Sequence, residues 1–129
     1  MNNTVDRSIL NTKMILICED EEYNFILLDS ILTRHGVNII WAKDGKQAVD
    51  HAQKFHIDIV LMDIKMPVMD GIDAFREIRK FNKQVPIIAQ TAYALKEDRD
   101  RILNVGFDEH IGKPIKSQQL LDVMCRFMS

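Results

Sequence analysis

The sequence is poor in cysteine: Cys18 and Cys125 are the only two in 129 residues. Two cysteines do not make the disulfide framework of a small secreted domain, so we expect both to be buried, reduced thiols. No apolar run reaches the length of about 18 residues that a bilayer span needs. The N-terminal segment MNNTVDRS lacks the apolar core of a signal peptide. These absences predict a cytoplasmic domain without membrane contact of its own, although a longer parent chain could be membrane-anchored.

The sequence also lacks an excess of either charge. Lys and Arg number 17 and Asp and Glu number 19, which gives a net charge of −2. Domains that bind nucleic acid by neutralising phosphates usually show a basic excess or stripe, so this balance argues against direct nucleic-acid binding. Hydrophobic residues make up 47% of the chain, which is too many for a disordered segment. The length predicts about one domain.

Short apolar runs alternate with stretches of helical spacing. The runs at 14–18, 38–42, 57–62 and 85–89 are typical of strands buried on both faces, and position more than composition adds 109–111. Helical spacing occurs at 22–35, 71–80, 95–104 and 117–127, and a narrower apolar stripe follows Asp44-Gly45. This alternation predicts an α/β fold, a flavodoxin-like (βα)5 doubly wound sandwich with a five-stranded parallel sheet in the order 2-1-3-4-5.

Two regions of the chain differ in pattern. Residues 1–12 are polar and aperiodic, which predicts a flexible extension or linker. Residues 13–129 contain all the strand and helix signals. We therefore expect one folded domain over 13–129.

Polar side chains stand at the ends of four strands that are neighbours in the expected sheet. They are Glu19 and Asp20 after the first strand, Asp63 after the third, Thr91 after the fourth and Lys113 after the fifth. One acidic residue in such a place is often just a solvated loop residue. Ligands of doubly wound folds bind outside the carboxyl ends of the strands, so the joint placement of all five predicts a site at this edge.

The residue types indicate the chemistry of the site. Two carboxylates about 4 Å apart repel by roughly 4 kcal/mol at an effective dielectric constant of 20, so the cluster must bind a proton or a cation. An all-oxygen cluster with few ligands suits Mg²⁺. A carboxylate can attack a phosphoryl group to form an aspartyl phosphate, and Mg²⁺, an ammonium and a hydroxyl would neutralise its charge. Neither GxGxxG nor GxxxxGK[ST] occurs, and no Ser/His/Asp constellation competes.

Four segments of the sequence resemble a known family. The segments ILICEDEEYN (15–24), LMDIKMPVMDG (61–71), PIIAQTAYALKEDRD (86–100) and GFDEHIGKP (106–114) closely resemble the receiver domain of two-component response regulators. The resemblance covers 13–127. DIKMPVMDG and TAYALKEDR are most similar to receivers attached to hybrid sensor histidine kinases.

The resemblance implies a metal site and a phosphorylation site. Asp63 would accept a phosphoryl group from a phosphohistidine on a histidine kinase or a histidine phosphotransfer protein. Mg²⁺ would be held by Asp20 and Asp63, by Glu19 through water and by the backbone carbonyl of Lys65.

Two further residues would complete this site. Thr91 would hydrogen-bond the phosphoryl group. Lys113 would form an ion pair with it, and the Lys113-Pro114 peptide would be cis.

Some positions depart from the family or modulate it. The family usually has Asp where this chain has Glu19, and the longer side chain should still reach the ion through water. His110 stands where the family has Tyr or Phe, whose rotation couples phosphorylation to the surface of the fourth helix, fifth strand and fifth helix. His110 would be a smaller, titratable switch or, alternatively, an exposed histidine without a switching role. Tyr93 and Lys65 would flank the phosphoryl group and slow its hydrolysis.

These residues leave three hypotheses about the function. The first is a phosphoacceptor signalling domain rather than a turnover enzyme, as a monomer or weak dimer. It would be part of a hybrid kinase or, alternatively, a stand-alone regulator. The second is a phosphatase of the haloacid dehalogenase kind, which needs an Asp where this chain has Lys65. The third is a degenerate receiver that serves only as a binding scaffold, against which the full set of site residues argues.

Overall fold

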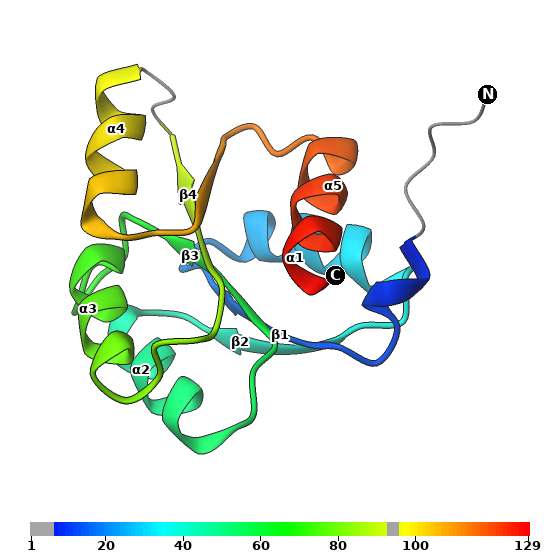
Figure 1. Cartoon of the computed structure of the whole chain (residues 1–129), viewed down its shortest axis with the longest axis horizontal. Coiled ribbons are helices and arrows are strands. Elements are labelled where there is room, and N and C mark those ends of the chain that lie inside the picture. Colours follow the sequence, from blue (N-terminus) through cyan, green and yellow to red (C-terminus); the bar gives the residue numbers. More distant parts are fainter. Residues whose placement is uncertain (1–6, 93–95) are drawn as a thin grey trace.

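The computed structural model describes residues 7–92 and 96–129, and for 96–98 the backbone alone. Figure 1 shows a central parallel sheet between two layers of helices. A short 3-10 helix, η1, precedes five strand–helix units. The elements are η1 (Arg7–Leu10), β1 (Met14–Cys18), α1 (Glu22–Thr33), β2 (Asn38–Ala42), α2 (Gly45–Lys54), β3 (Ile59–Asp63), α3 (Gly71–Phe81), β4 (Ile87–Thr91), α4 (Lys96–Val105), β5 (Glu109–Gly112) and α5 (Ser117–Met128).

The sheet has the order β2-β1-β3-β4-β5, and every neighbouring pair is parallel. The fold predicted from the sequence is therefore confirmed. Helices α1 and α5 cover one face of the sheet, and α2, α3 and α4 cover the other (Figure 1). All five strands end at one edge, which brings the polar residues that follow them together.

Two hydrophobic cores form because strand side chains alternate between the faces. Along β1, Ile15 and Ile17 join the core under α1 and α5, whereas Leu16 and Cys18 join the core under α2, α3 and α4. All four are fully buried. Such burial on both faces explains the continuous apolar runs in the sequence. Within the part of the chain that the structure describes, none of the helices combines the length and the apolar character that crossing a bilayer requires.

Strands β3 and β4 begin and end later than the sequence predicts. Pairing of β3 with β1 begins at Ile59, opposite Ile15, so residues 57–58 lie before the strand. There the backbone N–H of Met14 donates to the side chain of Asp58 (2.7 Å). At the other end, the ladder includes the polar residues Asp63, Gln90 and Thr91. Apolar composition missed these positions because pairing with neighbouring strands, and not side-chain polarity, holds them in the sheet.

The N-terminal segment corrects a second prediction. The sequence predicts a flexible extension over residues 1–12, of which 1–6 lie outside the described residues, but Arg7–Leu10 form η1, which packs against α5. Leu10 is fully buried in the core under α1 and α5. The backbone N–H of Thr12 also donates to the carbonyl of Gly36 (2.8 Å). The segment has too few apolar residues for a periodic signal, and its burial comes from contact with α5 and the core beneath it.

This packing predicts a measurable contribution to stability. Leu10→Ala should lower the free energy of unfolding by about 2 kcal/mol, because it removes buried methyl groups near the chain end, where partial collapse limits the cost. Urea unfolding of the two proteins checks this. A change below about 0.5 kcal/mol, typical of an exposed position, would contradict it.

Candidate functional site

Three carboxylates meet at the carboxyl ends of β1 and β3. Oxygen atoms of Glu19, Asp20 and Asp63 all lie within 4.8 Å of one another. Glu19 is fully buried and Asp63 is 5% exposed, whereas Asp20 is exposed. Water therefore screens the repulsion between the two inner carboxylates poorly, and the group can hold a hard cation such as Mg²⁺.

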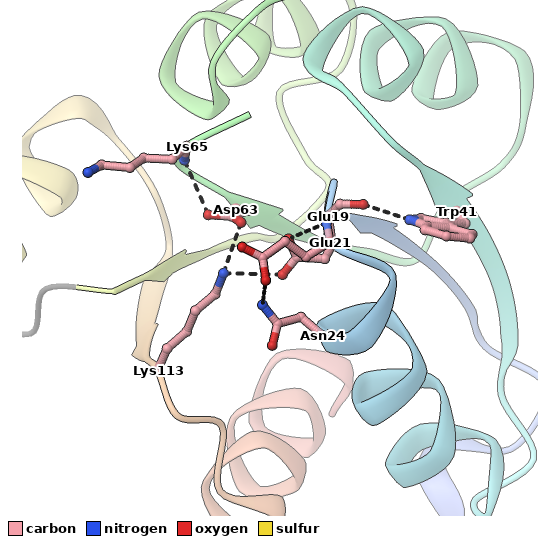
Figure 2. A network of polar contacts seen from close by, with 7 residues as sticks. All are labelled: Glu19, Glu21, Asn24, Trp41, Asp63, Lys65 and Lys113. Carbon is pink, nitrogen blue, oxygen red and sulfur yellow. Dashed lines mark hydrogen bonds and ion pairs between the residues drawn. The ribbon is translucent and has the colours of Figure 1, made fainter. Parts of the chain in front are cut away.

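The ammonium group of Lys113 lies against this cluster. Its Nζ lies 2.9 Å from Asp63 Oδ2 and 3.2 Å from Glu19 Oε1 (Figure 2). Burial alone would lower the pKa of Lys113, but hydrogen bonds and charge pairing with Asp63 and Glu19 outweigh it and raise that pKa above its usual value. Lys113 thus stays charged. The Lys113-Pro114 peptide is cis, as the family resemblance implies.

The surroundings of Glu19 shift its pKa. Burial, followed by the hydrogen bond and charge of Asp63, raises the pKa of Glu19 from 4.5 to about 7, although Lys113 acts in the opposite direction. When all three carboxylates are ionised, Lys113 offsets only one of the three charges. The site therefore has a deficit of positive charge that a divalent ion would fill, and its donors fit Mg²⁺.

The loop after Asp63 is held close to the phosphoacceptor candidate. The backbone N–H of Lys65 donates to Asp63 Oδ1 (3.2 Å), while its ammonium points away from Asp63 (Figure 2). Asp70 caps α3 by accepting from the N–H of Asp73 (2.8 Å). A Cβ on Gly71 would collide with the carbonyl of Asp63, so this close approach requires glycine.

An open cavity of about 280 Å³ adjoins the carboxylates. Asp63, Lys113 and Thr91 line it, together with Asp20 and Lys65. Thr91 is the last residue of β4 and is 7% exposed. Residues that carry a carboxylate, an ammonium and a hydroxyl therefore line one space that is open to a ligand.

The structure brings together five of the residues predicted from the sequence. They are Glu19, Asp20, Asp63, Thr91 and Lys113. Tyr93 lies outside the described residues. His110 is on β5 with its side chain 14% exposed, and its Nδ1 lies 3.5 Å from Glu109 Oε1. It is therefore not the exposed histidine that was one of the two alternatives.

Sequence reasoning missed three residues near the site. Arg101 and Ile102 of α4 line the cavity. Trp41 of β2 donates through its indole N–H to the backbone carbonyl of Glu19 (2.7 Å). No spacing rule could have found these contacts, because each joins elements that meet only in the folded sheet.

Comparison with known proteins gives the same assignment. The family model described as response regulator receiver domain matches residues 15–124. Hybrid signal transduction histidine kinase I of Dictyostelium discoideum is 40% identical over 119 residues, which are 85% of this chain and 7% of that kinase. The polar-differentiation response regulator DivK of Brucella ovis is 31% identical over 91% of this chain and 97% of its own length. The chain thus spans a small part of one relative and nearly all of the other.

Two solved structures share the fold. The receiver domain of sensor histidine kinase PA1611 from Pseudomonas aeruginosa, solved with a magnesium ion in the active site cleft, has a TM-score of 0.84 and 37% identity over 91% of this chain and 98% of its own. The second is the co-crystal structure of the Saccharomyces cerevisiae histidine phosphotransfer protein Ypd1 with the receiver domain of Ssk1. The matched chain has a TM-score of 0.85 and 28% identity, and the match covers 92% of this chain and 90% of that chain. From its matched family model and these relatives, this chain belongs to the response regulator receiver domains of two-component signalling.

Proposed function

We propose that this domain accepts a phosphoryl group on Asp63 from a phosphohistidine, with Mg²⁺ in the carboxylate cluster. The observation that carries the proposal is the placement of Asp63. Its carboxylate opens on the cavity, touches Lys113 at 2.9 Å and lies within 4.8 Å of the oxygens of Glu19 and Asp20. One group can thus act as nucleophile while its neighbours neutralise the charge of the incoming phosphate.

The transfer needs positioning more than acid–base chemistry. An oxygen of Asp63 forms a bond to phosphorus while the bond between phosphorus and the imidazole nitrogen breaks, and the imidazole keeps the electron pair. Lys113 and the Thr91 hydroxyl stabilise negative charge on the phosphoryl oxygens. Mg²⁺, held by Asp20, Asp63, the Lys65 carbonyl and Glu19 through water, would supply the remaining neutralisation.

The partner in this proposal is a histidine kinase domain or a histidine phosphotransfer protein. The complex of the Ssk1 receiver with Ypd1 supports it. We favour a parent chain that is a hybrid sensor histidine kinase, as in the Dictyostelium relative, and the alternative is a stand-alone regulator of the length of DivK. We further propose a cytoplasmic location, no direct nucleic-acid contact and a monomer or weak dimer.

The start of α1 offers the partner a surface beside the site. Glu21, next to the carboxylates, lines the cavity, and α1 begins at the following residue. Tyr23 and Ile26, three positions apart on this helix, are 79% and 52% exposed. Exposed apolar side chains next to a reactive group are typical of a protein docking surface. We therefore place the phosphohistidine partner against this end of α1.

Phosphorylation in this proposal changes the surface of α4, β5 and α5. Thr91 ends β4 and pairs with Gly112 of β5, while His110 pairs with Ala89. Both side chains are largely buried. Movement of Thr91 toward a phosphoryl group would open space on the side of the sheet where His110 lies. The partly buried position of His110, with its side chain 14% exposed, supports its role as the switch residue. Tyr93 and Lys65 remain the proposed modulators of phosphate loss.

The experiment that tests the function follows the intact mass of the protein with a small acyl phosphate. We expect the gain of one phosphoryl group with Mg²⁺, and almost none after removal of the metal with EDTA. Asp63→Asn should abolish the gain, because an amide is not the required nucleophile. Asp50→Asn, the same change at an exposed residue of α2, should leave it intact.

Other outcomes would contradict the proposal. No gain from the acyl phosphate or from a phosphorylated histidine kinase would favour a binding scaffold. Continuous release of phosphate from unrelated phosphate esters would favour a phosphatase.

A further inference from the structure

The backbone of Glu19 is attached to β2 at two points. Pairing of β1 with β2 ends at Cys18 and Ala42. Beyond this point the N–H of Glu19 still donates to the carbonyl of Ala42 (3.0 Å). The carbonyl of Glu19 accepts from the indole N–H of Trp41 at 2.7 Å (Figure 2). A side chain thus continues the attachment where the strand pairing stops.

Trp41 is itself held in a fixed position. Its ring stacks on Phe25 of α1 with a centroid distance of 4.0 Å and an interplanar angle of 8°. The ammonium of Lys43 lies 4.7 Å from the ring centroid. Stacking and a cation over the ring each restrict the indole, so the N–H is already aimed at its acceptor.

The bond acts on the residues of the metal site through peptide geometry. The carbonyl of Glu19 belongs to the planar peptide unit that joins Glu19 to Asp20. A held carbonyl therefore restricts the plane of this peptide, and with it the path of the backbone into Asp20. Asp20 is exposed and contributes an oxygen to the cluster, so it gains most from such an anchor.

We propose that Trp41 is a positioning residue for Mg²⁺ binding: its indole N–H holds the Glu19–Asp20 peptide so that the two carboxylates converge. This inference rests on the proposed function, because it takes the carboxylate cluster as the Mg²⁺ site. The alternative is that Trp41 only packs against α1 and contributes to stability.

The test compares Mg²⁺ affinity in folded variants by isothermal titration calorimetry with MgCl₂. Trp41→Phe retains an aromatic ring over Phe25 but loses the donor, and it should weaken Mg²⁺ binding about tenfold, the lower end of effects seen when residues that orient metal ligands are changed. Phe25→Leu loses the stacked ring but keeps the donor and the cation of Lys43 over the indole, so it should weaken Mg²⁺ binding clearly less than Trp41→Phe does. Circular dichroism confirms that each variant is folded.

A second measurement uses the wild-type protein alone. Trp41 is the only tryptophan, so a proton–nitrogen correlation spectrum contains a single indole N–H signal. That signal should be protected from solvent exchange and should shift on Mg²⁺ titration with the dissociation constant found by calorimetry.

The outcomes separate the two proposals. If wild type binds Mg²⁺ but Trp41→Phe binds it equally well, or Phe25→Leu loses as much affinity, the positioning role is wrong and the proposed function stands. An indole signal that stays unchanged at saturating Mg²⁺ would also overturn the positioning role. If wild type does not bind Mg²⁺ at all, both proposals fail.

Discussion

Lys113→Met is expected to slow the phosphorylation of Asp63 by a small acyl phosphate about 100-fold, the effect typical of losing one charge-stabilising donor in a transition state. Lys113 is the ammonium that lies 2.9 Å from Asp63, and methionine keeps much of its length without the charge. The phosphoryl group carries negative charge on its oxygens during transfer, so the loss falls on the chemical step. The initial rate of phosphoryl gain by intact mass, at saturating Mg²⁺, measures it.

Lys80→Met provides a matched control for the charge. Lys80 pairs with Glu77 on the surface of α3, and its side chain is 69% exposed. Its loss should leave the rate unchanged. A rate for Lys113→Met within about threefold of wild type would contradict the role given to Lys113 in charge stabilisation.

The raised pKa of Glu19 should make the free energy of unfolding fall as the pH rises. Its pKa in the folded protein is about 7, above the ordinary 4.5, so the folded state binds this proton more tightly than the unfolded state. The resulting stabilisation is fully present below about pH 4.5 and is lost as pH rises through about 7. At about 1.4 kcal/mol per pKa unit, the loss amounts to about 3 kcal/mol. Urea unfolding in EDTA at several pH values measures it.

The variant Glu19→Gln isolates this effect. Because glutamine does not titrate, the variant should exceed wild type in unfolding free energy by about 3 kcal/mol at high pH, with the difference disappearing at low pH. Glu77→Gln, a similar change on the surface of α3, should follow wild type. Mg²⁺ should restore much of the lost stability to wild type at high pH, because it binds only the folded cluster. Parallel pH curves for wild type and Glu19→Gln would show that the raised pKa is absent.

Local sequence pattern was sufficient to locate the strands and the polar residues that follow them. The apolar runs located the strands, and β1 and β2 match the predicted bounds. Asp63 and Thr91 were found as polar residues that follow such runs. The predicted third and fourth strands end too early, at residues 62 and 89, because a polar residue was taken as the end of a strand, whereas β3 continues to Asp63 and β4 to Thr91.

Contacts between residues far apart in the sequence could not be predicted from local pattern. Lys113 reaches Glu19 across 94 positions and Asp63 across 50, and Trp41 reaches Glu19 across 22. The raised pKa of Glu19 follows from burial among these partners and not from its neighbours in the chain. Leu10 is buried, and His110 partly buried, for the same kind of reason, since other elements cover them.

The sequence by itself determined the alternation of strands and helices, the family and the five polar residues of the site. Period and composition are local properties that a single chain displays directly. Only the tertiary structure decided how close the carboxylates lie, that burial raises the pKa of Glu19 and which side chain anchors the Glu19–Asp20 peptide. Those properties depend on distance and burial, and the packing of elements remote in sequence sets both.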